Sequence, residues 1–533
     1  MKRLVSKVVA SDGVAIGRAY VVHRSNQPLR TIDDGTAADA EVRFRTALQQ
    51  SRDELAALSS DSDIFAAHYE LIQDEALVGS VMKYIADGQS AMAACRSACD
   101  DYVAMFEAID DEYLRERSAD VKDIFRRIEE NIVGIHSNPF EGVKTGDILV
   151  ADELFPSDMA MVDFSKIAAF VTQRGSATSH VCIVARNANV VAVVGIEGLG
   201  DVQTGDMLIV DGALSSVFLN PTQQQIAMYR EKAKVLREAA NMDNQTAHKS
   251  IVSPDGERVM VYANAGSVAD VELAIALGAD GIGLLRSEFL FTGSDEQPTE
   301  EQQYAAYLSA AKACVEHVLT IRTLDVGGDK MLPYVDIPRE DNPFLGYRAI
   351  RISLDEEKMF CRQLRAILRV AAEANVRVMF PMITTIDELC QAKKLLEKCS
   401  RELSDEGVVF AKPVKVGVMI ETPAAVMITK ELAAECDFLS IGSNDLTQYI
   451  MAADRTNPKV ASLYDPGNIA VKRAVEYVIR TARTCGVECS ICGELASDKS
   501  MTMELFGYGL RAFSVNLGAV GRIKSTLLSG LGK

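Results

Sequence analysis

Residues 416–445 read VGVMIETPAAVMITKELAAECDFLSIGSND, and this stretch contains the alternation that decides the fold. Two short apolar runs, 416–420 and 438–442, are separated by a segment with helical composition. Such a strand–helix–strand unit predicts neighbouring parallel strands, whose carboxyl ends meet at one edge. Polar side chains follow both runs directly, namely Glu421 after the first and Ser443, Asn444 and Asp445 after the second.

The same alternation extends outward over residues 251–533. Eight apolar runs recur between helical patterns: 259–263, 281–285, 319–324, 376–380, 416–420, 438–442, 488–492 and 512–515. Eight strand–helix units in about 280 residues match the size of a (β/α)8 TIM barrel. A doubly wound parallel sheet is the alternative.

Polar residues follow the predicted strands, where an active site of a barrel enzyme would lie. Solvated loop residues would instead be scattered over both rims, so this arrangement favours a functional rim. In strand order the residues are Asn264; Arg286, Ser287 and Glu288; Arg322 and Asp325; Pro381 and Met382; Glu421; Ser443, Asn444 and Asp445; Cys492; and Asn516.

The residue types at this rim indicate the chemistry of the ligand. The planar, positively charged guanidinium groups of arginines bind phosphate and carboxylate groups through paired N–H donors. Two carboxylates on neighbouring strand ends suit Mg²⁺ together with substrate oxygens. We therefore expect a small, highly charged phosphorylated acid. The candidate arginines are Arg286, Arg322, Arg348 and Arg455, and the candidate metal ligands are Glu421 and Asp445.

Nearer the N-terminus, residues 37–133 contain no proline and only two glycines, with apolar residues at three- and four-residue spacing. Breaks near residues 59–63, 87–90 and 118–120 predict about four helices. Strand-like segments lie on both sides of this block. We expect one β-rich domain, formed by residues 1–24 and 141–222, with a helical bundle inserted at residues 25–140.

A polar, charge-rich segment at residues 223–250 predicts a linker helix between the β-rich domain and a C-terminal domain at residues 251–533. The β-rich domain contains a second candidate site in QRGSATSHVCIVAR, residues 173–186. A glycine turn, small hydroxyl residues and a following apolar helix place His180 near a helix N-terminus, which favours an anion on the imidazole. Thr178 and Ser179 are candidate donors to phosphate oxygens, and Arg186 is a candidate countercharge.

Net charge, apolar segments and cysteine content indicate which partners and which compartment to expect. A net charge of −19 disfavours binding to nucleic acid or anionic lipid and favours a partner with a basic surface. The N-terminal residues show no secretory signal, and no segment has the apolar length of a membrane span. Eleven cysteines without a signal indicate a reducing compartment, so we expect a cytoplasmic protein.

The spacing of Cys485, Cys489 and Cys492 is that of some iron–sulfur enzymes. Two of the three lie on one predicted strand, three residues apart, and therefore point to opposite faces. Convergence of the three thiolates on one cluster is not expected.

Eight motifs in this order and spacing resemble enzyme I of the bacterial sugar phosphotransferase system, the phosphoenolpyruvate–protein phosphotransferases. They span the whole chain: TSHVCIVAR (178–186), GLLRSEFLF (283–291), RTLDVGGDK (322–330), NPFLGYRAIR (342–351), MFPMI (379–383), ETPAA (421–425), IGSNDLTQY (441–449) and CGELA (492–496). Pyruvate phosphate dikinase and phosphoenolpyruvate synthase share most motifs but need a nucleotide-binding domain. We expect neither that domain nor an N-terminal sensory domain here.

The resemblance implies a multidomain α/β protein, with a swivelling phosphohistidine domain that contains the helical insertion and a barrel that binds phosphoenolpyruvate. It implies that His180 accepts the phosphoryl group, that Cys492 protonates the enolate to pyruvate, and that Mg²⁺ is the cofactor. The helical block would dock the phosphocarrier protein HPr, with His68 in the docking helix, and the barrels would form a homodimer. The implied substrate contacts are Arg286, Arg322, Arg348, Asn444, Asp445 and Arg455, and the implied metal ligands are Glu421 and Asp445.

Two positions depart from the family pattern. Ala177 stands where arginine is usual before the TSH motif, and Val191 replaces a usual proline. Two other functions remain open on the sequence: a barrel lyase or aldolase acting on phosphoenolpyruvate or pyruvate, and a non-catalytic phosphorelay regulator. A lyase needs no transferable histidine, and a relay tolerates loss of Glu421 and Asp445.

Overall fold

The computed structural model divides the chain into two compact units, residues 1–237 and 238–533, which are considered separately. The residues whose structure is described are 2–6, 8–11, 13–22, 34–58, 63–107, 112–134, 138–175, 181–182, 185, 190–292, 296–328, 332–338, 340–411, 413–455, 457 and 459–532.

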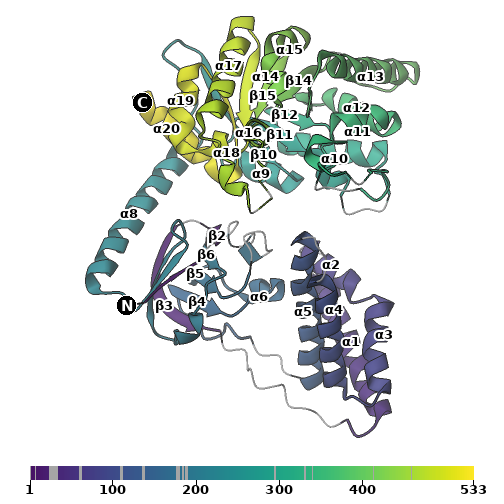
Figure 1. Ribbon diagram of the computed structural model, residues 1–533, viewed down its shortest axis with the longest axis vertical. Coiled ribbons are helices and arrows are strands. Elements are labelled where there is room, and N and C mark those ends of the chain that lie inside the picture. The colour runs from purple at the N-terminus through teal and green to yellow at the C-terminus, as the bar shows by residue number, and fades with distance from the viewer. Residues whose placement is uncertain are drawn as a thin grey trace. The chain divides into compact units, whose positions relative to one another are not determined.

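The second unit is a closed barrel of eight parallel strands, as predicted (Figure 1). Each strand pairs with the next along the chain, and the first pairs with both the second and the last. This closure excludes the doubly wound alternative. The strands are β10 (Arg258–Ala265), β11 (Gly281–Arg286), β12 (Val318–Arg322), β13 (Val376–Phe380), β14 (Lys415–Ile420), β15 (Phe438–Gly442), β16 (Glu488–Cys492) and β17 (Ala512–Val515). A short strand, β9 (Ile251–Val252), pairs antiparallel with β10.

Helices follow the strands and cover the outside of the barrel (Figure 1). The longer ones are α9 (Val268–Ala276), α10 (Glu300–Ala313), α12 (Glu357–Ala371), α13 (Ile386–Asp405), α16 (Ser443–Met451), α17 (Ile469–Cys485), α19 (Lys499–Tyr508) and α20 (Val520–Gly530). Shorter helices are α11 (Ile350–Asp355), α14 (Pro423–Met427), α15 (Thr429–Glu435) and α18 (Glu494–Ser497).

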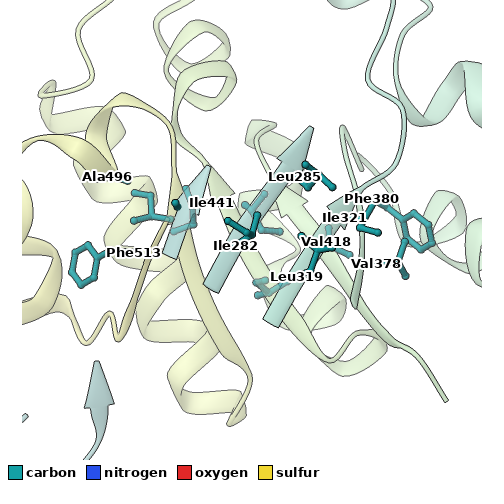
Figure 2. Close-up of a cluster of buried hydrophobic side chains, with 14 of the residues drawn as sticks. Ile282, Leu285, Leu319, Ile321, Val378, Phe380, Val418, Ile441, Ala496 and Phe513 are labelled. Atoms are coloured by element: carbon teal, nitrogen blue, oxygen red, sulfur yellow. The ribbon is translucent and has the colours of Figure 1, made fainter. Parts of the chain in front are cut away.

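The barrel has two hydrophobic layers because successive strand residues point to opposite faces. Outward residues such as Ile321, Val378 and Val418 belong to a large buried cluster that the strands share with the helices, part of which Figure 2 shows. Inside the barrel, a small apolar cluster consists of Leu284, Met379, Met419, Phe438 and Cys492. Buried polar side chains share the interior, where Arg377 donates to Thr320 at 2.7 Å.

The first unit contains a mixed sheet of eight strands in the order β1-β8-β7-β3-β4-β5-β6-β2. The edge strands β1 (Lys2–Val5) and β2 (Val8–Ser11) are joined by only two residues, whereas eight strands laid flat would span about 35 Å. The sheet must therefore curl. Ser6, between the two edge strands, is hydrogen-bonded to both ends of the sheet. Its N–H donates to the carbonyl of Ser215, next to β8, and its hydroxyl donates to the carbonyl of Val194 in β6.

The remaining strands of this sheet are β3 (Val14–Val21), β4 (Asp147–Ala151), β5 (Ile167–Thr172), β6 (Val191–Val194), β7 (Met207–Asp211) and β8 (Ser216–Leu219). Strands β3 and β4 are parallel neighbours although a helical block separates them along the chain. The short helix α6 (Pro156–Met161) follows β4.

The helical block contains five helices within the described residues: α1 (Ala37–Leu58), α2 (Asp63–Leu71), α3 (Glu75–Ala86), α4 (Ala91–Glu107) and α5 (Glu112–Val133). The predicted break at residues 118–120 is wrong, because α5 continues through it. Ser118 and Asp120 are buried, and Asp120 faces His68, so a tertiary contact rather than a turn explains these polar residues. The prediction also missed the break before α3, where the Asp74 side chain caps the helix by accepting from the Ala76 N–H.

Helix α8 (Gln223–Thr246) is continuous across the boundary between the two units. It covers residues 223–246 of the segment predicted as a linker at 223–250. None of the helices in the described ranges has both the length and the apolar character of a membrane-spanning segment.

Candidate active site

A cavity of about 140 Å³ lies at the carboxyl ends of the barrel strands. Five strands or their following loops contribute to it, as expected for the catalytic rim of such a barrel. The lining residues are Leu284, Arg286, Arg322, Asp325, Gly327, Phe344, Arg348, Met419, Glu421, Gly442, Ser443, Asn444, Asp445, Arg455, Cys492 and Gly493. All eight candidate substrate, metal and acid residues of the barrel are among them.

Two buried arginines are held in place by one carboxylate. Arg322 at the end of β12 lies 2.9 Å from one oxygen of Asp325, and Arg348 lies 3.0 Å from the other. Arg322 also bonds to Glu288, and Arg348 lies 3.4 Å from Asp445 Oδ2. Asp325 therefore fixes the separation and orientation of two guanidinium groups at once.

The arginines remain charged despite their burial. Burial lowers the pKa of Arg322, but Glu288 and Asp325 outweigh it and raise the pKa above its usual value. The same holds for Arg348, with Asp325 and Asp445 as the main partners. The Nε atoms of both arginines are buried without a hydrogen-bond acceptor among the described residues. Both arginines line the cavity, and each keeps a donor that no described residue uses.

The loop that carries Arg348 depends on a close approach at Gly327. This glycine has φ +96°, and a Cβ atom there would lie 2.6 Å from the carbonyl oxygen of Tyr347. Arg348 Nη1 also donates to Tyr449 Oη at 3.1 Å, and Tyr449 in turn donates to the Phe344 carbonyl. Larger residues at position 327 would displace the arginine.

Glu421, directly after β14, is buried beside two other carboxylates. Burial, with repulsion from Asp445 and Asp325, raises the pKa of Glu421 to about 8. Its Oε1 accepts a hydrogen bond of 2.6 Å from the Met382 N–H. Met382 has φ +58°, a conformation that costs a non-glycine residue roughly 1–2 kcal/mol. The strained backbone aims this N–H at the carboxylate.

Asp445 lies in the first turn of α16 and completes a carboxylate pair with Glu421. Its Oδ1 is buried and accepts no hydrogen bond from any described residue; Arg455 Nη2 lies 3.8 Å away. The neighbouring Asn444 accepts from the Glu494 N–H at 2.9 Å through its Oδ1, which leaves its amide NH₂ as a potential donor to a ligand. No group of three or more His, Cys, Asp or Glu side chains within the described ranges is arranged as a metal site.

Cys492 ends β16 and is buried in the inner cluster directly below the cavity. Burial, together with the charge of Glu421, raises the pKa of its thiol to about 11, so the thiol is protonated at neutral pH. Cys489 on the same strand packs against the outer core instead, and Cys485 is exposed at the end of α17.

Not every predicted rim residue lines the cavity. Asn264 is tied to β17, since its side chain donates to the Ser514 carbonyl and accepts from the Ser514 hydroxyl. Asn516 is exposed, and its N–H donates to Ser497. Arg286 lines the cavity but is exposed, so it belongs to the open side of the site.

The second candidate site is outside the described residues, as His180, Thr178, Ser179, Ala177 and Arg186 all are. Of its surroundings, Val181 and Cys182 are buried in one hydrophobic core of the β-rich domain. Val191 begins β6 and is paired with Ala169 of β5.

His68 on α2 is buried rather than exposed. Its Nε2 lies 3.2 Å from Asp120 Oδ1, and its Nδ1 lies 4.0 Å from Asp123 Oδ2 on α5. Asp123 also accepts from the N–H of Ser157 on α6 at 3.1 Å. The imidazole therefore belongs to a network that joins the helical block to the β-rich domain.

Sequence reasoning missed two functional positions. Asp325 and Glu288 were noted at the rim without a role, and the structure shows that they hold Arg322. The i,i+3 spacing of Arg322 and Asp325 in RTLD could have indicated their ion pair. Arg348 comes from a distant loop, so no sequence spacing indicates its ion pair with Asp325.

Comparison with known proteins agrees with this geometry. Residues 240–530 match the family model described as "PEP-utilising enzyme, PEP-binding domain". Residues 8–117 and 143–214 match the N-terminal and mobile domains of the same enzymes. The barrel and its charged cavity are therefore those of a phosphoenolpyruvate-utilising enzyme.

Similar curated proteins are phosphoenolpyruvate–protein phosphotransferases. That of Haemophilus influenzae is 40% identical over 540 residues, covering 98% of this chain and 93% of that protein. Those of Geobacillus stearothermophilus and Enterococcus faecalis are 38% and 37% identical, each over 99% of this chain and 96% and 94% of those proteins. The chain belongs to the phosphoenolpyruvate–protein phosphotransferase family.

Proposed function

We propose that the protein transfers the phosphoryl group of phosphoenolpyruvate to its own His180 and then to a histidine of a small phosphocarrier protein of the HPr type, releasing pyruvate, as the first step of sugar uptake. The observation that carries this proposal is the cavity itself: two buried arginines and a carboxylate pair converge at one barrel rim. The similarity to phosphotransferases over nearly the whole chain supports it.

The arginines bind the substrate. Phosphoenolpyruvate carries a phosphate and a carboxylate, and guanidinium groups recognise both through paired N–H donors. Arg322 and Arg348 are fixed by Asp325, so little side-chain freedom is lost on binding. Arg286 and Arg455 would contact the substrate from the more open side, and the Asn444 amide would donate to it. The cavity volume suits a ligand of this small size.

Glu421 and Asp445 would hold Mg²⁺. Asp445 has a buried oxygen that accepts no hydrogen bond from a described residue. Burial, with repulsion from Asp445 and Asp325, raises the pKa of Glu421, so a divalent cation fits this donor set. When bound, Mg²⁺ supplies positive charge to the phosphoryl oxygens and the enolate oxygen.

Charge neutralisation and positioning are what phosphoryl transfer mainly requires. The arginines supply both to the phosphoryl group, while the histidine in the first unit acts as the nucleophile. Since His180 must reach the cavity to accept the phosphoryl group and the acceptor at the helical block to pass it on, the proposal includes a movement of the first unit about the 223–250 segment. Such motions often limit turnover.

Cys492 would complete the reaction. Loss of the phosphoryl group leaves the enolate of pyruvate, which must be protonated to reach the stable ketone. A protonated thiol below the cavity is placed to deliver this proton, and its raised pKa keeps it in the acid form.

The helical block would dock the acceptor, in keeping with the acidic chain and a basic partner. Because His68 is buried, its role would be to hold α2 against α5 rather than to touch the acceptor. A homodimer through the barrels is part of the same proposal.

The metal assignment is tested with Glu421→Ala and Asp445→Ala. Each should lower Mg²⁺-dependent phosphorylation of the protein by at least about 10²-fold, because charge stabilisation of that order is lost. Circular dichroism should show a folded protein in each case. Full activity of either variant at limiting Mg²⁺ would refute the assignment.

A further inference from the structure

Two cysteines on the outside of the barrel lie against each other. Cys361 is on α12 and Cys399 is on α13, and these helices pack side by side. The Cys399 thiol donates to the Cys361 carbonyl oxygen at 3.7 Å, which brings its sulfur close enough to the Cys361 thiol to shift the pKa of both. Cys399 is fully buried, whereas Cys361 is partly exposed.

The two thiols are not equivalent chemically. The hydrogen bond from Cys399 and the nearby positive charge of Lys398 lower the pKa of Cys361, against partial burial and the acidic Glu357 and Glu402. The pKa of Cys399 is raised by the same hydrogen bond and by burial. An accessible thiol that ionises readily, next to a buried partner, is the arrangement found in redox-sensing cysteine pairs.

We propose that Cys361 and Cys399 form a reversible disulfide when a peroxide reaches the protein, fastening α12 to α13. The Cys361 thiolate attacks one peroxide oxygen, the O–O bond breaks, and the products are a sulfenic acid and hydroxide. The Cys399 sulfur then attacks the sulfenic sulfur, the S–O bond breaks, and water leaves. Overall, two thiols are oxidised and one hydrogen peroxide is reduced to two waters.

The link would close a loop of roughly 40 residues that contains β13, which should raise the unfolding temperature of the barrel by roughly 3–8 °C. Helix α12 also carries Gln363, which donates to Ser287 and accepts from the Leu324 N–H. Ser287 and Leu324 directly precede Glu288 and Asp325 in the chain, and these two carboxylates hold Arg322. The disulfide would therefore stiffen the frame behind the cavity.

The full chain, fully reduced, should be treated with stoichiometric hydrogen peroxide, alkylated and digested with trypsin without reduction. Cleavage after Lys358, Arg362, Lys398 and Arg401 releases residues 359–362 and 399–401, which should appear as one linked peptide in mass spectra. Dithiothreitol should restore two free thiols. The linked peptide should accompany the rise in unfolding temperature.

Cys390→Ser is the matched control, since Cys390 is a partly buried cysteine on the same helix as Cys399. It should keep the linked peptide and the temperature shift, while Cys361→Ser and Cys399→Ser should lose both. If a variant does not fold, the linked peptide in the peroxide-treated wild-type protein still tests the proposal. Cys361 accumulating as sulfinic acid, links between other cysteines only, or no thiol loss at position 399 would each overturn the proposal.

Discussion

At the scale of single residues, Asp325 organises the candidate site without a role in the proposed chemistry. Each of its oxygens holds one buried arginine, so the positions of the two guanidinium groups are set before any ligand arrives. The sequence identified the arginines, because this residue type is unusual at apolar strand ends. It could not identify their pairing, because Arg348 reaches the site from a loop whose path depends on the whole fold.

Cys492→Ala separates the steps of the proposed reaction. Transfer of the phosphoryl group does not itself require the proton, but completing pyruvate does. Multiple turnover should therefore fall by roughly 10²–10⁴-fold, while binding of phosphoenolpyruvate changes little. Steady-state pyruvate release and equilibrium binding measure the two effects.

Cys485→Ala and Cys489→Ala serve as controls, because neither side chain lines the cavity. They should affect stability at most. Comparable losses in all three variants would indicate a shared role for the cysteines. Undiminished turnover in Cys492→Ala would assign the proton to another donor.

Glu421→Gln tests the electrostatics of the metal-free site. The pKa of Glu421 is about 8 in the folded protein and lies near 4.5 in the unfolded chain. Between these values the folded state holds the extra proton, so this residue's contribution to stability is full below pH 4.5 and is lost as pH rises to about 8. The loss is on the order of 5 kcal/mol.

The measurement is urea denaturation of the wild type and of Glu421→Gln at several pH values, with a chelator present to keep the site free of metal. The free energy of unfolding of the wild type should fall relative to that of Glu421→Gln as pH rises through this window. Parallel curves would mean that Glu421 is ionised throughout, and that the buried carboxylates are stabilised in another way.

At the scale of elements, the eight barrel strands were predictable because each apolar run is short and is followed by polar residues. The helical block was harder to divide. Buried polar side chains such as Asp120 imitate a turn signal in the sequence, and only the packed structure shows that they meet His68. The local sequence pattern thus predicted the barrel strands, whereas buried polar contacts between helices can be recognised only in the folded structure.

The end of β15 leaves room for the carboxylate of Glu421, a proposed metal ligand. A Cβ atom at Gly442 would lie 2.6 Å from Glu421 Oε2, although the backbone there suits any residue, with φ −84°. Gly442→Ala should therefore displace the Glu421 side chain, because the added Cβ would also lie 2.9 Å from Glu421 Cβ. The Mg²⁺ concentration for half-maximal phosphorylation should rise roughly 10–100-fold.

Gly507→Ala on α19 is the matched control, because a Cβ built there has no atom of another described part of the chain within 4 Å. It should leave the Mg²⁺ dependence unchanged and stabilise the helix by about 0.4–1 kcal/mol. An unchanged Mg²⁺ dependence in Gly442→Ala would show that Glu421 does not ligate the metal.

At the scale of the whole molecule, the proposed reaction is divided between two units of one chain. The barrel contains the charged cavity, and the first unit contains the histidine segment and the helical block. Neither unit alone would transfer phosphate from phosphoenolpyruvate to another protein. This division distinguishes a transferase from a barrel lyase, which would complete its reaction in the cavity.

The most direct measurement is incubation with phosphoenolpyruvate carrying a labelled phosphoryl group and Mg²⁺, for the wild type and His180→Ala, followed by mapping of the label. The wild type should acquire an acid-labile label on the peptide containing His180. His180→Ala should acquire none while still binding phosphoenolpyruvate, since the cavity lies in the other unit. Label retained on His180→Ala, or pyruvate released by it at the wild-type rate, would contradict the account.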